Sequence, residues 1–141
     1  MRVVIGSDHG GFELKRELLS LLKDLGHEVV DFGTHSTEPV DYPDIACLVA
    51  NAVAREAGGN TVGIVIDGAG TGSAMTANKV PGVRAAACYD TFTAKNSREH
   101  NHANVLTLGS RNTGIEIARE IVKVWLSSSF AGSRHMRRIE K

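Results

Sequence analysis

One segment of the sequence combines a carboxylate with a glycine-rich turn. The run 63–66 is apolar, Asp67 follows it, and glycines stand at positions 68, 70 and 72. Glycine lets the backbone approach an anion closely, and the helix expected next adds N–H donors and partial positive charge. The carboxylate could serve as a general base while the loop N–H groups stabilise negative charge on oxygen. This segment therefore indicates acid–base chemistry on an anionic substrate.

Two other interpretations of this segment stay open. Glycine-rich turns between a strand and a helix also occur for packing reasons alone. A dinucleotide fingerprint would use the same glycines, with Asp90, 20 residues after Gly70, binding a ribose. That match is imperfect, because Ser73 stands at the third glycine position and Pro81 and Gly82 leave room for only a short helix. A P-loop is excluded, since no Gly-Lys-Ser/Thr closes the loop.

Composition limits the class of protein. The chain has 141 residues, with 16 basic and 16 acidic side chains and a formal net charge of zero. Such a length predicts one domain that buries about two-thirds of its unfolded surface. Neutral charge gives no attraction to nucleic acid or membranes, and no stretch approaches the ~18 apolar residues of a spanning helix. We expect a single domain over residues 1–141 whose partner is a small molecule, with no nucleic-acid or membrane partner.

The cellular compartment is predicted from the N-terminus and the cysteines. The first residues show neither the apolar region nor the cleavage site of a signal peptide. Cys47 and Cys88 are expected to be buried, unreactive thiols, and a pair is too few for a disulfide framework. We therefore expect a cytoplasmic protein.

Short β-rich runs alternate with helical stripes along the chain. Strands are expected at 2–7, 27–31, 62–66, 83–88 and 104–108. In the helices between them, Gly26 is expected as a C-cap, Pro43 in a first turn, and a capping box at 113–116. This alternation predicts an α/β fold with a five-stranded parallel sheet and helices on both faces. Residues 128–141 are expected to form a C-terminal arm.

Ligands of open parallel sheets bind at the carboxyl ends of the strands. Asp8 and His9 are expected there after the first strand, Asp67 with its loop after the third, and Arg111 after the fifth. Together they offer a carboxylate, N–H donors, a histidine, and an arginine that can bind phosphate through two hydrogen bonds.

The C-terminal arm is basic although the protein is neutral. Arg134 and Arg138 are four residues apart and would share one helical face. They could clamp a dianionic phosphate belonging to this chain's site or to a partner's site. A solvated terminus is the alternative.

Six segments of the chain resemble the ribose-5-phosphate isomerase B family, which also includes the galactose-6-phosphate isomerase subunits. These segments are Gly6 to Phe12, Asp41 to Pro43, Gly68 to Gly72 with Ala77 to Lys79, Ser97 to Asn101, Gly109 to Arg111, and Arg134 to Arg138. They occur in the family's order over almost the whole chain. Each segment is a weak signal alone, and together they are specific.

The resemblance implies a Rossmann-like, three-layer α/β/α sandwich that works as a homodimer or a tetramer of dimers, with active sites shared between subunits. It implies aldose–ketose isomerisation of a phosphorylated sugar, most simply ribose 5-phosphate to ribulose 5-phosphate, through a cis-enediolate. It implies no cofactor and no metal.

The resemblance also implies roles for individual residues. His100 would assist ring opening, and Thr71 could supply from the next turn the catalytic hydroxyl that the family often carries at the position of Ala69. Loop N–H groups would hold the enediolate oxygens, and arginines would bind phosphate with help from His9. The implied substrate-binding residues are Asp8, His9, Tyr42, Gly68, Ala69, Gly70, Gly72, Asn101, Arg111, Arg134 and Arg138.

Position 67 departs from the family pattern. Many members carry a cysteine there that moves the proton between C1 and C2, and another branch places a glutamate at the position of Ser73. Neither base is present, and Ala69 stands where a hydroxyl residue is frequent. The simplest hypothesis makes Asp67 the base, a role that contributes about 10²–10⁴-fold to a rate. The alternatives are another tetrose, pentose or hexose phosphate as substrate, a non-catalytic partner subunit, or a nucleotide-binding module.

Overall fold

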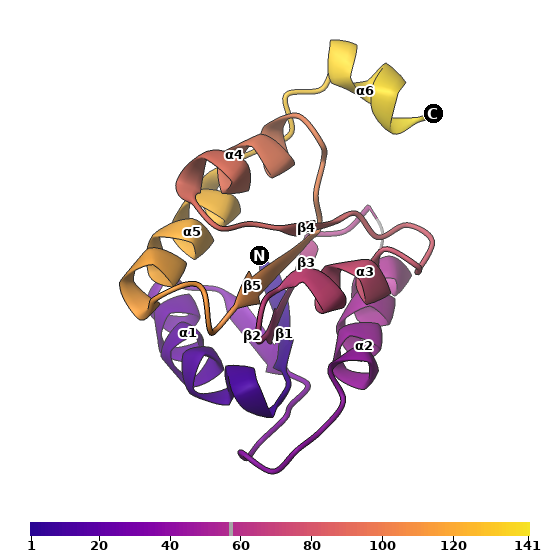
Figure 1. The fold of residues 1–141 in the computed structure, drawn as a ribbon. Coiled ribbons are helices and arrows are strands. Elements are labelled where there is room, and N and C mark those ends of the chain that lie inside the picture. Colours follow the sequence, from indigo (N-terminus) through magenta and orange to yellow (C-terminus); the bar gives the residue numbers. More distant parts are fainter. Residues whose placement is uncertain (57) are drawn as a thin grey trace.

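All paired strands of the described chain run parallel in one five-stranded sheet (Figure 1). The computed structural model describes residues 1–56 and 58–141. Its elements are β1 (Arg2–Ser7), η1 (His9–Gly11), α1 (Phe12–Asp24), β2 (Glu28–Asp31), α2 (Tyr42–Arg55), β3 (Thr61–Asp67), α3 (Thr71–Ala77), β4 (Ala85–Ala87), α4 (Thr91–Glu99), β5 (Val105–Gly109), α5 (Ile115–Ser127) and α6 (Arg134–Ile139). The order β2-β1-β3-β5-β4 places the three strands that end in candidate site residues next to one another.

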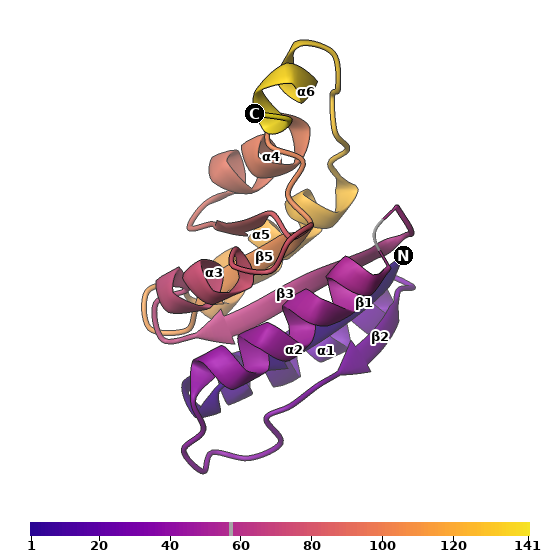
Figure 2. The same cartoon turned by 90° about the vertical axis from the view of Figure 1, so that its right-hand side faces the viewer.

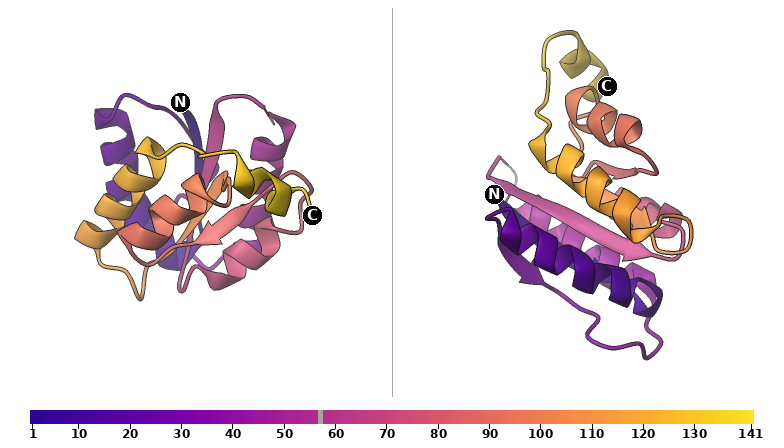
Figure 3. Two further views of the ribbon diagram at one scale, coloured as in Figure 1. Left: turned by 90° about the horizontal axis from the view of Figure 1, so that it is seen from above. Right: turned by 90° about the vertical axis from the view of Figure 1, so that its left-hand side faces the viewer.

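Helices cover both faces of the sheet (Figures 2 and 3). On one face, α1, α4 and α5 pack around a cluster that includes Leu18, Ile64 and Trp125, each 0% exposed. On the other face, α2 and α3 contribute Val49 and Ala77 to a second cluster. The predicted α/β/α sandwich is confirmed. Among the described helices, none is both long and apolar enough to cross a membrane.

Close packing of α2 on β3 fixes the strand that ends in Asp67. A Cβ at Gly63 would lie 2.7 Å from Val49 Cγ1 and 3.1 Å from Val53 Cγ2, which is too close for a larger residue. Glycine at this strand position therefore lets the helix approach the sheet directly. The seven residues of β3 are all buried, so the strand delivers its terminal carboxylate from a rigid support.

The helix termini match the sequence expectations except at α5. Gly26 follows α1 with a φ of +86°, and Pro43 lies in the first turn of α2. The capping box predicted at 113–116 is wrong. The N-cap of α5 is Gly114, which has no side chain to cap the helix, and the Thr113 hydroxyl donates to Asn112 Oδ1 instead.

Two further expectations differ from the structure. The strand predicted at 83–88 is only Ala85–Ala87, because this edge strand pairs with β5 alone. The prediction of two buried thiols is wrong for Cys47, which α2 turns toward solvent, whereas Cys88 is buried as expected. Burial raises the pKa of the Cys88 thiol, so this cysteine is kept in its unreactive protonated form.

Candidate active site

A pocket of about 420 Å³ lies where β1, β3 and β5 end. Its lining comes from three loops far apart in sequence, as the rule for open parallel sheets predicts. The lining residues are Asp8, His9, Gly10, Gly68, Ala69, Arg111 and Asn112. The structure therefore brings together the first-strand and fifth-strand candidates with the glycine loop.

The Asp67 carboxylate is buried and turned into the glycine loop. Its Oδ1 accepts a hydrogen bond from the N–H of Gly70, and its Oδ2 accepts from the N–H of Ser73 at 3.0 Å and from the Ser73 hydroxyl at 2.7 Å. Gly70 has a φ of +81°, a left-handed conformation that favours glycine. The carboxylate thus holds the loop closed and keeps lone pairs on Oδ1 for a further donor or proton.

Both ends of the loop are tied to the end of β5. The N–H of Ser110 donates to the Asp67 carbonyl at 2.8 Å, and the N–H of Arg111 donates to the Gly68 carbonyl at 3.0 Å. The buried Thr107 hydroxyl donates to the Gly70 carbonyl at 2.6 Å. The loop is therefore part of the rigid edge of the sheet.

Several loop N–H groups stay available for a ligand. Among the described residues, no hydrogen bond uses the N–H of Ala69, Thr71 or Gly72. The N–H of Gly70, expected to bind substrate, donates to Asp67 in this structure. The Tyr42 ring covers Gly72, because a Cβ there would lie 2.6 Å from two ring carbons. Donors of this kind, next to an aromatic side chain, are suited to binding an anion.

The charged walls of the pocket are held by short local contacts. Asp8 Oδ1 accepts from the N–H of Gly11 at 3.0 Å, which caps the turn that carries His9. His9 Nδ1 lies 3.1 Å from the N–H donor of Val40. The Arg111 side chain lies over Gly68, since a Cβ added to Gly68 would be 3.8 Å from Arg111 Cδ. A cation and a histidine thus flank the loop donors.

A second group of predicted residues lies in a different pocket. His100, Asn101 and Arg138 line it together with Arg84, Asn96, His135 and Ile139. The His135 ring stacks on the His100 ring with centroids 4.2 Å apart, and the N–H of Ala131 donates to the Glu99 carbonyl at 2.9 Å. These contacts hold α6 beside the end of α4. Arg134 and Arg138 are both exposed on α6.

The two groups lie at opposite ends of the strands. α4 begins after the carboxyl end of β4 and ends at His100, just before the amino end of β5. Figures 1 and 2 show α6 beside α4, far from α1 and from the carboxyl end of β3. One chain therefore does not bring His100, Asn101 and Arg138 to Asp67.

Two residues that contact candidate site residues are not predicted from the sequence to be part of the site. The hydroxyl and N–H of Ser73 donate to Asp67. His135 is 6% exposed and stacks on His100. A hydroxyl six residues after a carboxylate and a histidine between two arginines were the available signals.

Comparison with known proteins decides the family. Residues 3–141 match the family model described as Ribose/Galactose Isomerase. The chain belongs to this family. It is 46% identical over 140 residues to ribose-5-phosphate isomerase B of Escherichia coli, covering 99% of this chain and 92% of that protein. The resemblance stated from the sequence is therefore confirmed.

Solved structures of the family have the same fold. Ribose-5-phosphate isomerase B of Clostridium thermocellum is 51% identical with a TM-score of 0.95, covering 99% of this chain and 93% of that one. The Mycoplasma genitalium ribose-5-phosphate isomerase B with bound ribulose-5-phosphate is 41% identical with a TM-score of 0.96, covering 99% and 91%. The ribose/galactose isomerase fold thus extends over almost the whole chain, α6 included.

The His100–His135 stack predicts pH-dependent docking of α6. Burial, His100 and the cations of Arg134 and Arg138 lower the pKa of His135 below its ordinary value. A released arm therefore binds more protons than a docked arm as pH falls below about 6.5, and docking weakens on acidification. Amide hydrogen exchange over 134–139, corrected for intrinsic rates, should be faster at pH 5.5 than at pH 7.5 relative to α5. His135→Phe, which can stack without titrating, should reduce this difference; equal protection at both pH values would contradict the prediction.

Proposed function

We propose that the chain is a metal-free aldose–ketose isomerase that interconverts ribose 5-phosphate and ribulose 5-phosphate through a cis-enediolate. In this reaction a base removes the proton from C2 and returns it to C1, while a proton moves from O2 to O1. The observation that carries the proposal is a buried carboxylate, Asp67, beside the available N–H groups of its own loop. Family membership and the relative with bound ribulose-5-phosphate support the substrate class.

Asp67 is the proposed base of this reaction. Three hydrogen bonds from Gly70 and Ser73 fix its orientation, and an oriented base is worth more than a mobile one. The N–H groups of Ala69, Thr71 and Gly72 would stabilise the charge that develops on the enediolate oxygens. In this proposal Gly70 shapes the turn, and the exposed Thr71 hydroxyl assists proton movement between oxygens.

The remaining residues would bind the rest of the sugar phosphate. His9 and Arg111 supply donors on one side of the pocket, where Asp8 binds sugar hydroxyls and Tyr42 closes the loop side. His100 and Asn101 would open the furanose ring and bind a ring oxygen, and Arg134 and Arg138 would complete the phosphate clamp.

We propose that this second set comes from another copy of the chain. His100 and Arg138 lie in a separate pocket at the other end of the strands, so a complete site needs two chains. Large apolar side chains remain exposed on α3 and α4, with Met75 at 69% and Phe92 at 75% exposed. Such groups favour burial against a partner, and a twofold homodimer is the commonest arrangement. The two free thiols suit a cytoplasmic enzyme.

A substrate panel tests the proposed function. Purified protein with EDTA present should convert ribose 5-phosphate to ribulose 5-phosphate, followed by absorbance of the ketose, with lower kcat/KM on tetrose and hexose phosphates. A better substrate among those sugars would reassign the specificity within the family. Nucleotide binding without turnover of any sugar phosphate, or activity that appears only after a homologous chain is added, would overturn the proposal.

The second prediction concerns the base. Asp67→Asn retains the size of the side chain and removes its basicity, so kcat should fall about 10²–10⁴-fold while the Kd for a non-reacting phosphosugar changes little. Ser73→Ala removes only one donor to the carboxylate and should cost about tenfold or less. This matched variant separates loss of the base from loosening of the loop. Full activity in Asp67→Asn would remove Asp67 from the mechanism.

The third prediction concerns sites shared between subunits. Asp67→Asn and Arg138→Ala chains should each be inactive, Arg138→Ala through a strongly raised KM because the phosphate loses a charged partner. After statistical subunit exchange, half of the dimers would be hybrids and each hybrid would contain one site with both native residues, so about a quarter of the parental activity should return. Exchange is verified by mass spectrometry of the mixed dimer. Exchange without recovered activity would mean that both residues serve one site of one chain.

A further inference from the structure

Lys15 has a charged side chain that is buried in the protein interior. It lies in α1, its side chain is 1% exposed, and it belongs to neither pocket of the proposed active site. Burying an ammonium group is costly unless it is paired and hydrogen-bonded. Its partners must therefore hold their positions for the native structure to be stable.

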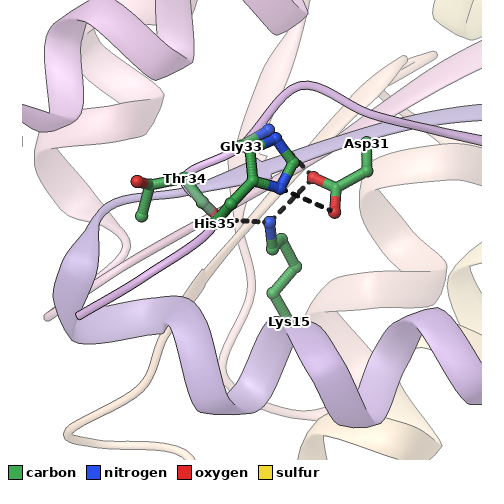
Figure 4. Close-up of polar contacts among 5 residues, drawn as sticks. All are labelled: Lys15, Asp31, Gly33, Thr34 and His35. Atoms are coloured by element: carbon green, nitrogen blue, oxygen red, sulfur yellow. Dashed lines mark hydrogen bonds and ion pairs between the residues drawn. The ribbon is translucent and has the colours of Figure 1, made fainter.

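Both hydrogen-bond partners of Lys15 lie at the start of one loop. Its Nζ donates to Asp31 Oδ1 at 2.7 Å and to the carbonyl oxygen of Thr34 (Figure 4). Asp31 Oδ1 also accepts from the N–H of Gly33 at 2.9 Å. His35, which is 71% exposed, lies farther away, with Nδ1 3.8 Å from Asp31 Oδ2. Movement of residues 31–34 away from α1 would leave the buried ammonium with no hydrogen-bond acceptor.

The same residues continue along β1 beyond the end of β2. The N–H of Ser7 donates to the Gly33 carbonyl at 2.7 Å, and the N–H of Thr34 donates to the Ser7 carbonyl at 2.7 Å. Ser7 directly precedes Asp8 and His9, so the start of the loop is fixed next to the turn that carries them. Lys15 thus anchors residues 31–34 to α1 while β1 anchors them to the site.

The far end of this loop contacts His9. The N–H of Val40 donates to His9 Nδ1 at 3.1 Å, and the Val40 carbonyl oxygen lies 3.2 Å from the same nitrogen. The N–H of Val40 fits an unprotonated Nδ1 and its carbonyl oxygen fits a protonated one, so the two contacts alone allow either neutral tautomer. An anion at Nε2 needs a donor there, which selects the tautomer in which Nδ1 accepts from the Val40 N–H and Nε2 carries the proton. The loop thereby leaves Nε2–H as the donor available to a substrate oxygen.

We propose that Lys15 and Asp31 are positioning residues: their buried ion pair holds the loop 31–40 so that Val40 sets the Nε2–H tautomer of His9 for an anionic substrate. The assignment rests on the proposed function only for the identity of that substrate. The tautomer itself is a property of the free protein. It is therefore measured independently of turnover.

The direct test is ¹⁵N NMR of the His9 ring at about pH 8, where an unperturbed imidazole is neutral. The parent should show a protonated Nε2 and an unprotonated Nδ1. In Lys15→Met and in Asp31→Asn, the two nitrogens should shift toward values for mixed tautomers. Asp31→Asn preserves the size of the side chain and gives a second reading if Lys15→Met folds poorly. Unchanged His9 shifts in a folded Asp31→Asn protein overturn the proposal.

Kinetics supply the second readout and separate the proposal from the proposed function. In both variants KM for ribose 5-phosphate should rise about tenfold with kcat changed less than about threefold, because a displaced donor weakens binding of substrate and transition state alike. His35→Ala, an exposed neighbour of the same carboxylate, should leave KM and the tautomer unchanged. Leu22→Ala, a core change in the same helix, should lower stability in urea without raising KM. An inactive parent whose tautomer still depends on Lys15 would count against the proposed function alone, whereas an active parent with KM unaffected in both variants would overturn the positioning role.

Discussion

The compensation of one buried charge organises the carboxyl edge of the sheet. β3 is buried over its whole length and ends in Asp67, which is only 5% exposed. An ionised group in that position needs donors, and the loop supplies them by folding back through Gly70 and Ser73. Anchoring of the same loop on β5 transmits this geometry to Arg111. The anion site therefore follows from how the strand end satisfies its own charge.

The alternative to a loop that is folded on Asp67 would be a flexible glycine loop that becomes ordered only around a ligand. Hydrogen bonds on both of its sides, including the buried Thr107 hydroxyl, exclude that behaviour for the described loop. Gly70 and Gly72 allow close packing, since a Cβ would lie 3.0 Å from the Leu108 carbonyl carbon at position 70 and 2.6 Å from the Tyr42 ring at position 72. A Cβ at Gly109 would lie 2.6 Å from the Ala69 carbonyl carbon, which shows how tightly the two strand ends meet. A rigid loop can place N–H donors with the accuracy that stabilisation of a developing oxyanion requires.

The sequence predicts those features that depend on local pattern and on topology. Apolar runs with β-branched residues predict most of the strands, and the parallel order places Asp8, Asp67 and Arg111 at one edge of the sheet, where Asp8 and Arg111 line the same pocket. It does not predict features that depend on the path of the chain in space. The His100–His135 stack joins residues 35 positions apart through an irregular segment in which Ser133 has a φ of +51°. The failed capping box at Thr113 has a local origin instead, because the side chain of the adjacent Asn112 accepts the Thr113 hydroxyl.

The packing of α6 against α4 of the same chain reduces the conformational entropy that association of two chains would cost. The histidine stack and the Ala131–Glu99 hydrogen bond order the arm within a single chain, so its arginines are already held on a formed helix before any second molecule arrives. A disordered tail would have to lose its conformational freedom at the moment of association, which weakens binding. In this chain, the arm loses its conformational freedom when the monomer folds. In the proposed homodimer, two such chains would meet as nearly rigid bodies, and their association rate would be limited by orientation rather than by ordering of the arm.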